Sequence, residues 1–192
     1  VTDKKAVTVH DVKVIPQPVG AYVDYLMNCE DPDVVRESRV LVVDPGFFSV
    51  DWIAIDKGNF DQASSDSSQE AMSALLEEAA KLIEDDHNRP QDLATLEHAV
   101  RTTGKVPALG KMVEIAPYLG WAAGPVAESV MRKVRQKLRR SEVAGADFTL
   151  LAGGGAEFYR EAAATIMSGT KVVTTQDPVL ANSRGFFEYG RA

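Results

Sequence analysis

The sequence has a single cysteine and only three histidines, and each scarcity excludes a class of functional site. Cys29 alone can form neither an intrachain disulfide nor a cysteine-based metal site. The histidines (His10, His87 and His98) are scattered and lack the spacing that metal ligands show. There is also no G-x-S-x-G motif, so a Ser-His-Asp hydrolase has no support.

Long hydrophobic runs and an excess of positive charge are missing as well. No apolar run approaches the roughly 20 residues that a membrane-spanning helix needs, and no signal peptide is visible. The net charge of −7 argues against nucleic-acid or membrane binding by the domain as a whole. We therefore expect a cytoplasmic domain, and 192 residues with 45% hydrophobic content provide ample material for a core.

The most informative segment that is present covers residues 40–55, VLVVDPGFFSVDWIAI. An apolar run ends at an acid, a glycine-containing turn follows, and a second apolar run begins; this order predicts a strand, a tight turn and a second strand. Asp44 then lies at the end of the first strand, Gly46 lets the backbone approach a ligand, and Ser49 offers a hydroxyl. We interpret the turn as facing a phosphate, with Asp51 as the weaker second acid. The alternative is a hairpin turn without a ligand, which Asp44 simply caps.

A second turn of the same kind follows further along the chain. The apolar strand predicted at 148–151 leads into Gly153, Gly154, Gly155 and Ala156, and then into a helix. Glycines at this place let a backbone approach a flat nucleoside closely. A plain turn or a loose Rossmann element are the alternatives, but the Rossmann fingerprint is G-x-G-x-x-G and opens the first unit of a parallel sheet.

Hydrophobic periodicity predicts the remaining elements. We expect strands at 7–15 and 172–174, and helices at 21–27, 72–83, 90–104, 125–140 and 156–167. A turn is expected at 57–59. Residues 61–68 are polar and serine-rich, which suits a mobile loop, and Ser67-x-x-Glu70 predicts a capping box for the following helix. Residues 107–124 hold several turn-forming residues and receive no assignment.

Six basic residues lie close together near the middle of the chain (Arg132, Lys133, Arg135, Lys137, Arg139 and Arg140). At helical spacing they flank an apolar stripe of Val130, Val134 and Leu138, so a solvated helix face is the leading interpretation. A phosphate- or partner-binding edge is the alternative. Nucleic-acid binding would favour interleaved aromatic residues, and there are none in this run.

Taken together, these segments resemble the actin-like ATPase superfamily, which includes actin, the heat-shock chaperone ATPases, the sugar kinases and the plasmid-segregation ATPases of the ParM/StbA kind. Residues 44–51, DPGFFSVD, are similar to the family's second phosphate loop, Asp-x-Gly-x-x-Thr-x-Asp, and residues 150–156 to its adenosine motif. Residues 15–21, IPQPVGA, resemble the first connecting helix, and residues 181–186, ANSRGF, the post-adenosine segment of the plasmid members. The wording DPGFFSVDW is most similar to the PRTRC-system actin-like proteins.

The resemblance implies an α/β fold: a ribonuclease-H-like domain that has a mixed sheet, flanking helices and a small helical subdomain inserted at roughly 88–125. No first phosphate loop precedes Val40. The resemblance therefore implies the carboxy-terminal half only. Residues 1–39 would be the end of a missing amino-terminal domain and the connecting helix, and residues 40–192 the carboxy-terminal domain.

The resemblance also assigns cofactors, ATP and Mg²⁺, and the residues that bind them. Asp44 would hold Mg²⁺ through water, Gly46 and Ser49 would bind phosphate, and the segment from Gly153 to Ala156 would face the adenosine. Gln17 would orient the attacking water; its alternative is a solvent-facing residue between two prolines. Phe47 and Phe48 depart from the small residues that the family has there, which bears on hydrolysis more than on binding.

As a function, the resemblance implies the nucleotide-binding half of a bacterial actin-like ATPase that forms filaments and serves plasmid segregation or maintenance. Its partners would be ATP or ADP, further copies of the full-length protein and a DNA-binding adaptor, with no membrane and no direct nucleic-acid contact. Two alternatives stay open: a sugar or metabolite kinase of the same superfamily, and a non-catalytic interaction domain. We expect negligible hydrolysis by this chain alone, because half of the phosphate contacts would belong to the missing domain.

Overall fold

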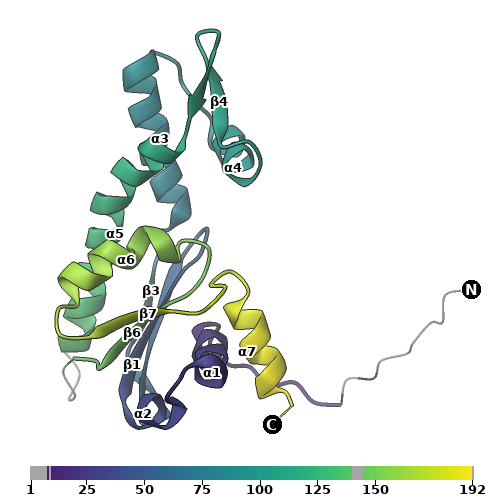
Figure 1. Cartoon of the computed structure of the whole chain (residues 1–192), viewed down its shortest axis with the longest axis vertical. Helices are drawn as coiled ribbons and strands as arrows, with labels where there is room; N and C mark the ends of the chain where they lie inside the picture. The colour runs from purple at the N-terminus through teal and green to yellow at the C-terminus, as the bar shows by residue number, and fades with distance from the viewer. Residues whose placement is uncertain (1–7, 9, 140–144, 192) are drawn as a thin grey trace, which may run out of the picture.

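The structure is a computed structural model, and it describes residues 8, 10–139 and 145–191. Its centre is a five-stranded mixed sheet with the strand order β3-β2-β1-β6-β7 (Figure 1). β1, β2 and β3 are antiparallel neighbours, whereas β6 and β7 run parallel to β1. The strands are β1 (Arg39–Pro45), β2 (Val50–Asp56), β3 (Asn59–Ser68), β6 (Phe148–Leu151) and β7 (Lys171–Thr174). The predicted hairpin and the predicted strands at 148–151 and 172–174 are therefore confirmed.

β1 lies in the middle of the sheet because its side chains are apolar on both faces. Val40 and Val42 pack into one hydrophobic cluster and Leu41 and Val43 into another, and all four are fully buried. Successive residues of a strand point to opposite faces, so a continuous apolar run of this kind needs helices on both sides. Asp44 is the first polar residue after this run and lies near the strand end.

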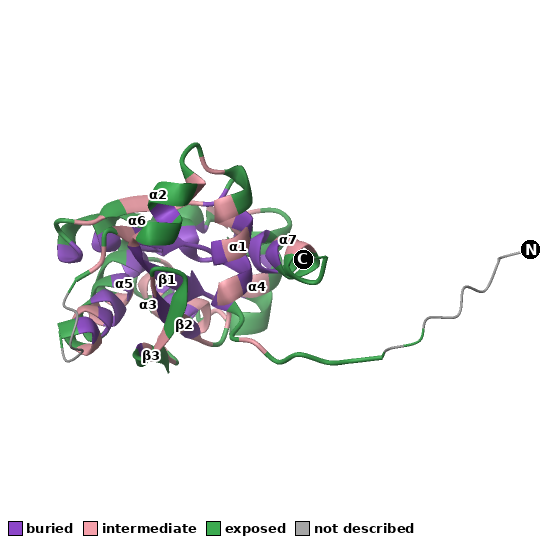
Figure 2. Cartoon of the chain, turned by 90° about the horizontal axis from the view of Figure 1, so that it is seen from below, coloured by how far each residue is buried: buried purple, intermediate pink, exposed green. Residues whose placement is uncertain are grey.

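Helices cover both faces of the sheet (Figures 1 and 2), and the central strand β1 lies fully buried between them. On the side of Leu41 and Val43 are α5 (Ala116–Arg139) and α6 (Ala156–Ile166). On the side of Val40 and Val42 are α1 (Pro18–Asn28), the short α2 (Pro32–Glu37) and α7 (Ala181–Tyr189). The predicted helices at 21–27 and 156–167 are confirmed, although α1 begins earlier, at Pro18.

A second packed unit extends beyond the sheet, at the top of Figure 1. It contains α3 (Met72–His87), α4 (Leu93–Arg101), the hairpin of β4 (Lys105–Ala108) and β5 (Lys111–Glu114), and the first part of α5. Its core includes Leu76, Ile83, Leu96, Val106 and Ile115. The helices predicted at 72–83 and 90–104 are confirmed, although α4 begins after Pro90, at Leu93, and ends before Gly104, at Arg101. The unassigned residues 107–124 contribute to the hairpin and to the start of α5. A separate subdomain with bounds at 88–125 stays a prediction.

The prediction of a mobile loop at 61–68 is wrong, because these residues belong to β3, which pairs with β2. Ser64 is fully buried in the middle of this strand. Its hydroxyl donates to Asp61 at 2.6 Å and accepts from Arg39 Nη2 at 2.9 Å. The polar composition was misleading because polar side chains of this edge strand satisfy one another, while the backbone pairs with β2.

Two predicted helix starts are also wrong. Ser67 lies inside β3, and α3 begins only at Met72 with no side-chain cap, so Ser67 and Glu70 form no capping box. α5 begins at Ala116 and not at Pro125, which lies inside the helix. The proline was misleading because prolines favour the first turn of a helix; here it occupies an exposed position within α5.

The strand predicted at 7–15 is absent from the described residues of that segment, which have no regular secondary structure. Val12 and Val14 are 75% and 92% exposed. Their alternation with polar residues indicated a half-buried strand, but a strand needs a neighbour to pair with. Within the described residues no strand of the sheet pairs with this segment.

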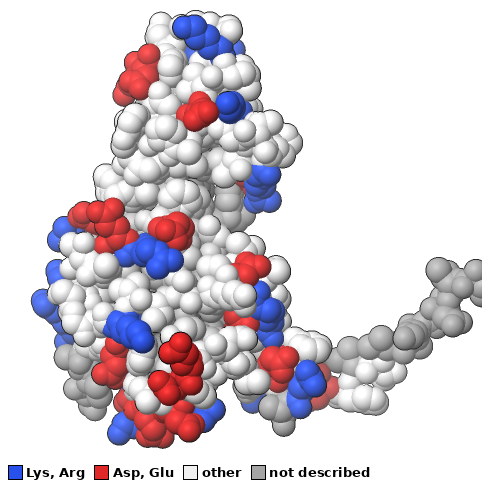
Figure 3. Space-filling model, in the orientation of Figure 1, with Lys and Arg blue, Asp and Glu red and all other residues white. Residues whose placement is uncertain are grey.

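The basic run of α5 lies mainly among acidic neighbours. Lys133 pairs with Glu70, Lys137 lies 2.8 Å from Asp66, and Arg132 pairs with Glu128 at 2.9 Å. On the face seen in Figure 3, the described basic side chains stand beside acidic ones and form no continuous positive surface. Arg140 lies outside the described residues. None of the helices within the described residues is both long and apolar enough to cross a membrane.

Candidate functional site

The two glycine-containing turns predicted from the sequence meet at one edge of the sheet. β1 and β6 are adjacent and parallel, so their carboxyl ends lie side by side. The Gly155 N–H donates to the Pro45 carbonyl at 2.9 Å, which joins the two turns directly. Ligands of open α/β sheets bind at the carboxyl ends of the strands. This edge is therefore the place to look for a site.

The turn between β1 and β2 is closed by its own backbone and fixed against α3. The Gly46 N–H donates to the Ser49 carbonyl at 2.8 Å. The carbonyls of Gly46 and Phe47 accept from the N–H groups of Met72 and Ser73, the first two residues of α3. Because these helix N–H groups have no partner within their own helix, the turn takes the place of the missing side-chain cap.

The hydroxyl of Ser49 does not stand free. It donates to Asp51 Oδ2 at 2.8 Å, and Asp51 lies directly opposite Asp44 in the β1–β2 register. Two carboxylates and one hydroxyl thus lie close together at the turn that joins β1 and β2. The predicted phosphate-binding roles of Gly46 and Ser49 stay predictions; in this structure the Gly46 amide shapes the turn and the Ser49 hydroxyl orients Asp51.

The three glycines after β6 have different surroundings. Gly153 has φ +74°, and a Cβ there would lie 2.1 Å from Asp44 Oδ1. A Cβ on Gly155 would lie 2.8 Å from the Pro45 Cβ. A Cβ on Gly154 would meet nothing within 4 Å. Gly153 and Gly155 are therefore required by contact with β1, whereas Gly154 faces open space, and the buried Ala156 begins α6.

Asp44 is only 3% exposed, and its partners come from both ends of the chain. Asn182 Nδ2 of α7 donates to Asp44 Oδ2 at 2.7 Å, and Gln17 Nε2, before α1, lies 3.4 Å from the same oxygen. Burial raises the pKa of Asp44 above its ordinary range, the hydrogen bond from Asn182 opposes this, and the Asp51 charge adds to it. The structure thus brings the two predicted catalytic residues, Gln17 and Asp44, into contact.

Three further residues of this region were missed by the sequence reasoning. Asn182 and Arg184 belong to the segment ANSRGF, in which the resemblance assigns a role to no single residue. Arg184 binds the buried Asp24 of α1 through Nε at 2.7 Å and Nη2 at 2.9 Å. A bidentate pair of this kind fixes one helix against the other. Nothing in the spacing of Asp24 pointed to this partner, which is 160 residues away in the sequence.

Beside the glycine turn lies a cavity of about 430 Å³, a size typical of small-molecule sites. Its walls are mostly apolar. They comprise Gly46, Phe47, Met72, Leu76, Val100, Gly154 and Val179, with Glu97 and Arg101 as the charged members. Glu97 and Arg101 pair with each other at 2.6 Å. Phe47 is therefore part of the cavity wall, while Phe48 is 77% exposed.

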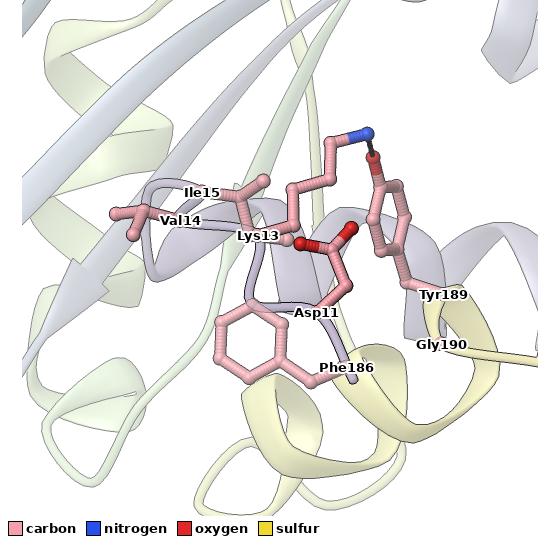
Figure 4. Close-up of a pocket in the computed structure, with 7 residues that line it drawn as sticks. All are labelled: Asp11, Lys13, Val14, Ile15, Phe186, Tyr189 and Gly190. Atoms are coloured by element: carbon pink, nitrogen blue, oxygen red, sulfur yellow. Dashed lines mark hydrogen bonds between the residues drawn. The ribbon is translucent and has the colours of Figure 1, made fainter. Parts of the chain in front are cut away.

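A second hollow, of about 910 Å³, lies away from both turns (Figure 4). It forms where residues 11–15 pass along α7, and Phe186 and Tyr189 line its other side. The Lys13 amine contacts the Tyr189 hydroxyl and lies 4.9 Å from the centre of its ring. None of the residues predicted to bind a nucleotide lines this hollow, so we do not place the site there.

The carboxylates at the sheet edge suit one kind of metal site. Within the described residues, no group of three or more His, Cys, Asp or Glu side chains is placed to hold a metal ion. A closed site made only of protein ligands is thus not found in this part of the chain. Mg²⁺ keeps several waters and is commonly held by one or two carboxylates together with substrate phosphates. Asp44, with Asp51 beside it, fits that donor set.

Comparison with known proteins gives a fold but no sequence family. No family model matches the chain, and no curated protein matches it. Among solved structures, the archaeal actin homolog Ta0583 is 21% identical, with a TM-score of 0.75 over 92% of this chain and 55% of that protein. Its complex with ADP is 19% identical, with a TM-score of 0.73 over 92% and 56%. A ParM from a 15-stranded Clostridium botulinum filament is 19% identical, with a TM-score of 0.68 over 93% and 53%.

These identities show the fold alone. The chain spans about half the length of these proteins. The matched region covers more than nine tenths of the chain. The predicted α/β fold class is confirmed: the chain has the actin-like fold, in the form shared by an archaeal actin homolog and ParM.

Proposed function

We propose that this chain is the nucleotide-binding half of an actin-like ATPase and that it binds ATP with Mg²⁺ where β1 and β6 end. The observation that supports this most strongly is the meeting of Asp44 with the turn 153–155 beside an apolar cavity of about 430 Å³. The sequence predicts both segments to face a nucleotide, and they are distant along the chain. A cavity at their junction is what a shared ligand would require.

In this proposal the nucleoside occupies the cavity. Phe47, Met72 and Val100 give apolar walls for a base, and Gly154 leaves space where any larger residue would intrude. Glu97 offers an acceptor and Arg101 a donor for the polar edges of the nucleoside. The phosphates would lie toward the β1–β2 turn and the amino end of α6, where the helix dipole favours negative charge.

Asp44 would hold Mg²⁺ through a water, because the carboxylate is almost fully buried and both of its oxygens have close neighbours. When bound, Mg²⁺ would neutralise charge on the phosphates. Gln17 would orient the attacking water; its amide can donate and accept a hydrogen bond but cannot act as a base. Phosphoryl transfer needs positioning and charge stabilisation, which is what these residues can supply.

The finer parts of the proposal rest on the resemblance and on the neighbours. We place residues 40–192 in the carboxy-terminal half and residues 1–39 at its junction with an amino-terminal half. One neighbour is bound to ADP and another forms a filament, which supports nucleotide binding and self-association by the full-length protein. A role in plasmid segregation, a DNA-binding adaptor and a cytoplasmic location belong to the same proposal.

The test is Mg-ATP binding by the full-length protein, measured by calorimetry. Asp44→Asn removes the charge but keeps an oxygen for Asn182, and Gly154→Val adds a branched side chain to the cavity wall at a position where a Cβ meets nothing within 4 Å. We expect Asp44→Asn to lose the magnesium-dependent part of the affinity and Gly154→Val to lose binding. Gly120→Val is a matched control, because Gly120 is exposed in α5 and a Cβ there also meets nothing within 4 Å.

Binding that is undetectable in the wild type would contradict the proposal, and so would binding that is equal in all four proteins. The non-catalytic alternative has one observation in its favour, Phe47 in the cavity wall. It predicts ATP binding without turnover in the full-length protein. The kinase alternative predicts phosphate transfer to a small hydroxylated acceptor, and light scattering with ATP would distinguish it from a filament-forming ATPase.

A further inference from the structure

Asn182 of α7 contacts both the candidate site and helix α1. It is 9% exposed. Its Nδ2 donates to Asp44 Oδ2 at 2.7 Å, and its Oδ1 accepts from the Ala21 N–H at 3.1 Å. A single amide therefore joins the end of β1, the first turns of α1 and the start of α7.

The two hydrogen bonds determine which way the amide faces. A carboxylate can only accept, and a backbone N–H can only donate. The Asn182 oxygen must therefore face Ala21 and its nitrogen must face Asp44, since the reverse orientation would oppose like groups at both ends. Without the Asp44 carboxylate, the Asn182 nitrogen would lose the partner that holds it in place. The Asn182 oxygen, which accepts from the Ala21 N–H, would then lose its fixed position as well.

α1 and α7 are in unusually close contact around this amide. A Cβ on Gly20 would lie 2.4 Å from the Asn182 carbonyl oxygen, and a Cβ on Gly185 would lie 1.7 Å from the Gly20 carbonyl oxygen. The Asp24–Arg184 pair joins the same two helices further along. Backbones that touch in this way have no flexible side chains between them to absorb a displacement, so a shift at one helix is passed to the other.

We propose that Asn182 is a positioning residue that couples the Asp44 carboxylate to the packing of α1 against α7. A ligand at Asp44 would then change the protection of both helices, although neither helix needs to touch the ligand. The proposal rests on the proposed function for the identity of that ligand. The coupling itself is a property of the contacts described above.

The first test needs no nucleotide. Amide hydrogen exchange of residues 18–28 and 181–189 is compared between Asp44→Ala, which removes the acceptor for Asn182, and Asp44→Asn, which retains one. We expect faster exchange at the start of α1 in Asp44→Ala and little change in Asp44→Asn. Residues 105–114 of the β4–β5 hairpin serve as an internal reference, because general loosening of the fold would also speed exchange there.

The second test adds ADP with and without Mg²⁺. Asn182→Ala should lower the affinity for Mg-ADP roughly ten- to hundredfold, the effect expected for losing a hydrogen bond to a charged group, and should abolish the protection of α1 that Mg-ADP induces. Ser183→Ala is the matched control, since Ser183 is exposed and its hydroxyl donates to the nearby Leu180 carbonyl at 2.8 Å. A merely structural role of Asn182 would speed exchange equally with and without the ligand.

Exchanging the two groups separates positioning from charge. In the double variant Asp44→Asn with Asn182→Asp, the new asparagine can donate to the new carboxylate, whose other oxygen can accept from Ala21. We expect the amides of α1 to be better protected from hydrogen exchange in this double variant than in Asn182→Ala. The magnesium-dependent affinity should not return, because the carboxylate has moved from β1 to α7.

Equal exchange of α1 in Asp44→Ala and Asp44→Asn would overturn the coupling, whatever the nucleotide does. The coupling would also be overturned if Asn182→Ala kept the wild-type affinity for Mg-ADP and the protection of α1 from hydrogen exchange that Mg-ADP induces. Failure of the wild type to bind ADP would instead contradict the proposed function, and the comparison without ligand would still decide on Asn182.

Discussion

Gly153→Ala is a substitution whose effect on stability can be worked out from the structure in some detail. Gly153 has a φ of +74°, which L-residues with a side chain rarely adopt. An added Cβ would also lie 2.1 Å from Asp44 Oδ1 and 2.9 Å from the Pro45 carbonyl oxygen. Neither neighbour can easily move, because the Pro45 carbonyl belongs to the backbone of β1 and the Asp44 carboxylate is held by Asn182.

The expected loss of stability has two parts. The left-handed backbone costs a residue with a Cβ about 1–2 kcal/mol, and overpacking of a filled region costs about 1–3 kcal/mol. The lower entropy of the unfolded alanine chain offsets about 0.4–1 kcal/mol of this. The sum is about 2–4 kcal/mol of unfolding free energy. In a chain of this size, that corresponds to a fall in Tm of roughly 4–16 °C.

The assay is thermal and urea denaturation of Gly153→Ala beside Gly154→Ala. Gly154 lies in the same turn, but a Cβ there meets nothing within 4 Å and the backbone is not left-handed. Its alanine variant should therefore stay within about 0.5 kcal/mol of the wild type. If Gly153→Ala proved as stable as Gly154→Ala, the close contact between the glycine turn and β1 would be refuted, and with it the geometry of the candidate site.

Three further results are expected. Because burial raises the pKa of Asp44 above its ordinary value of 3.8, the native state binds this proton more tightly than the unfolded chain, and the ionised carboxylate lowers stability above its folded pKa. Asp44→Asn should thus be more stable than the wild type at pH 7 in urea denaturation, with the difference vanishing as the pH falls below 3.8; a less stable variant at pH 7 would contradict this. Arg184→Leu leaves the carboxylate of Asp24 buried without its bidentate partner and should cost about 2–3 kcal/mol, less than a fully buried pair because Arg184 is partly exposed; Asp24→Asn with Arg184→Leu should recover part of that loss. Ser64→Ala removes a buried hydroxyl that accepts from Arg39 and should cost about 1–3 kcal/mol, whereas a mobile loop at this position would make the change neutral.

The parts of the fold that the sequence predicts well are those in which one strand or helix carries its own pattern. The run 40–43 is apolar at every position, and the strand ends at an acid and a glycine, so β1 and its turn could be predicted without any partner. The strand at 148–151 and the turn of three glycines that follows it at 153–155 could be predicted in the same way. That the two turns meet could be inferred only from the resemblance, because nothing local in either segment states that β1 and β6 are parallel neighbours.

The errors arose where a residue is explained by a distant partner. β3 is polar because Asp61 and Ser64 bind Arg39 of β1, from which they lie 22 and 25 residues away, and composition alone predicts a loop there. α3 needs no capping box because the carbonyls of Gly46 and Phe47 serve its first N–H groups. Asn182 was overlooked for the same reason, since its role depends on Asp44, which lies 138 residues earlier.

The three glycines of the turn 153–155 differ in how strongly each one supports a bound nucleotide. Gly153 and Gly155 are required by contact with Asp44 and Pro45, whether or not a nucleotide ever binds. Their presence therefore supports the fold and says little about the ligand. Gly154 is different: packing leaves room for a Cβ, and the position opens on the cavity. A glycine that the fold does not demand is best explained by a molecule that approaches it, so Gly154→Val, rather than a change at either neighbour, separates a nucleotide site from a plain turn.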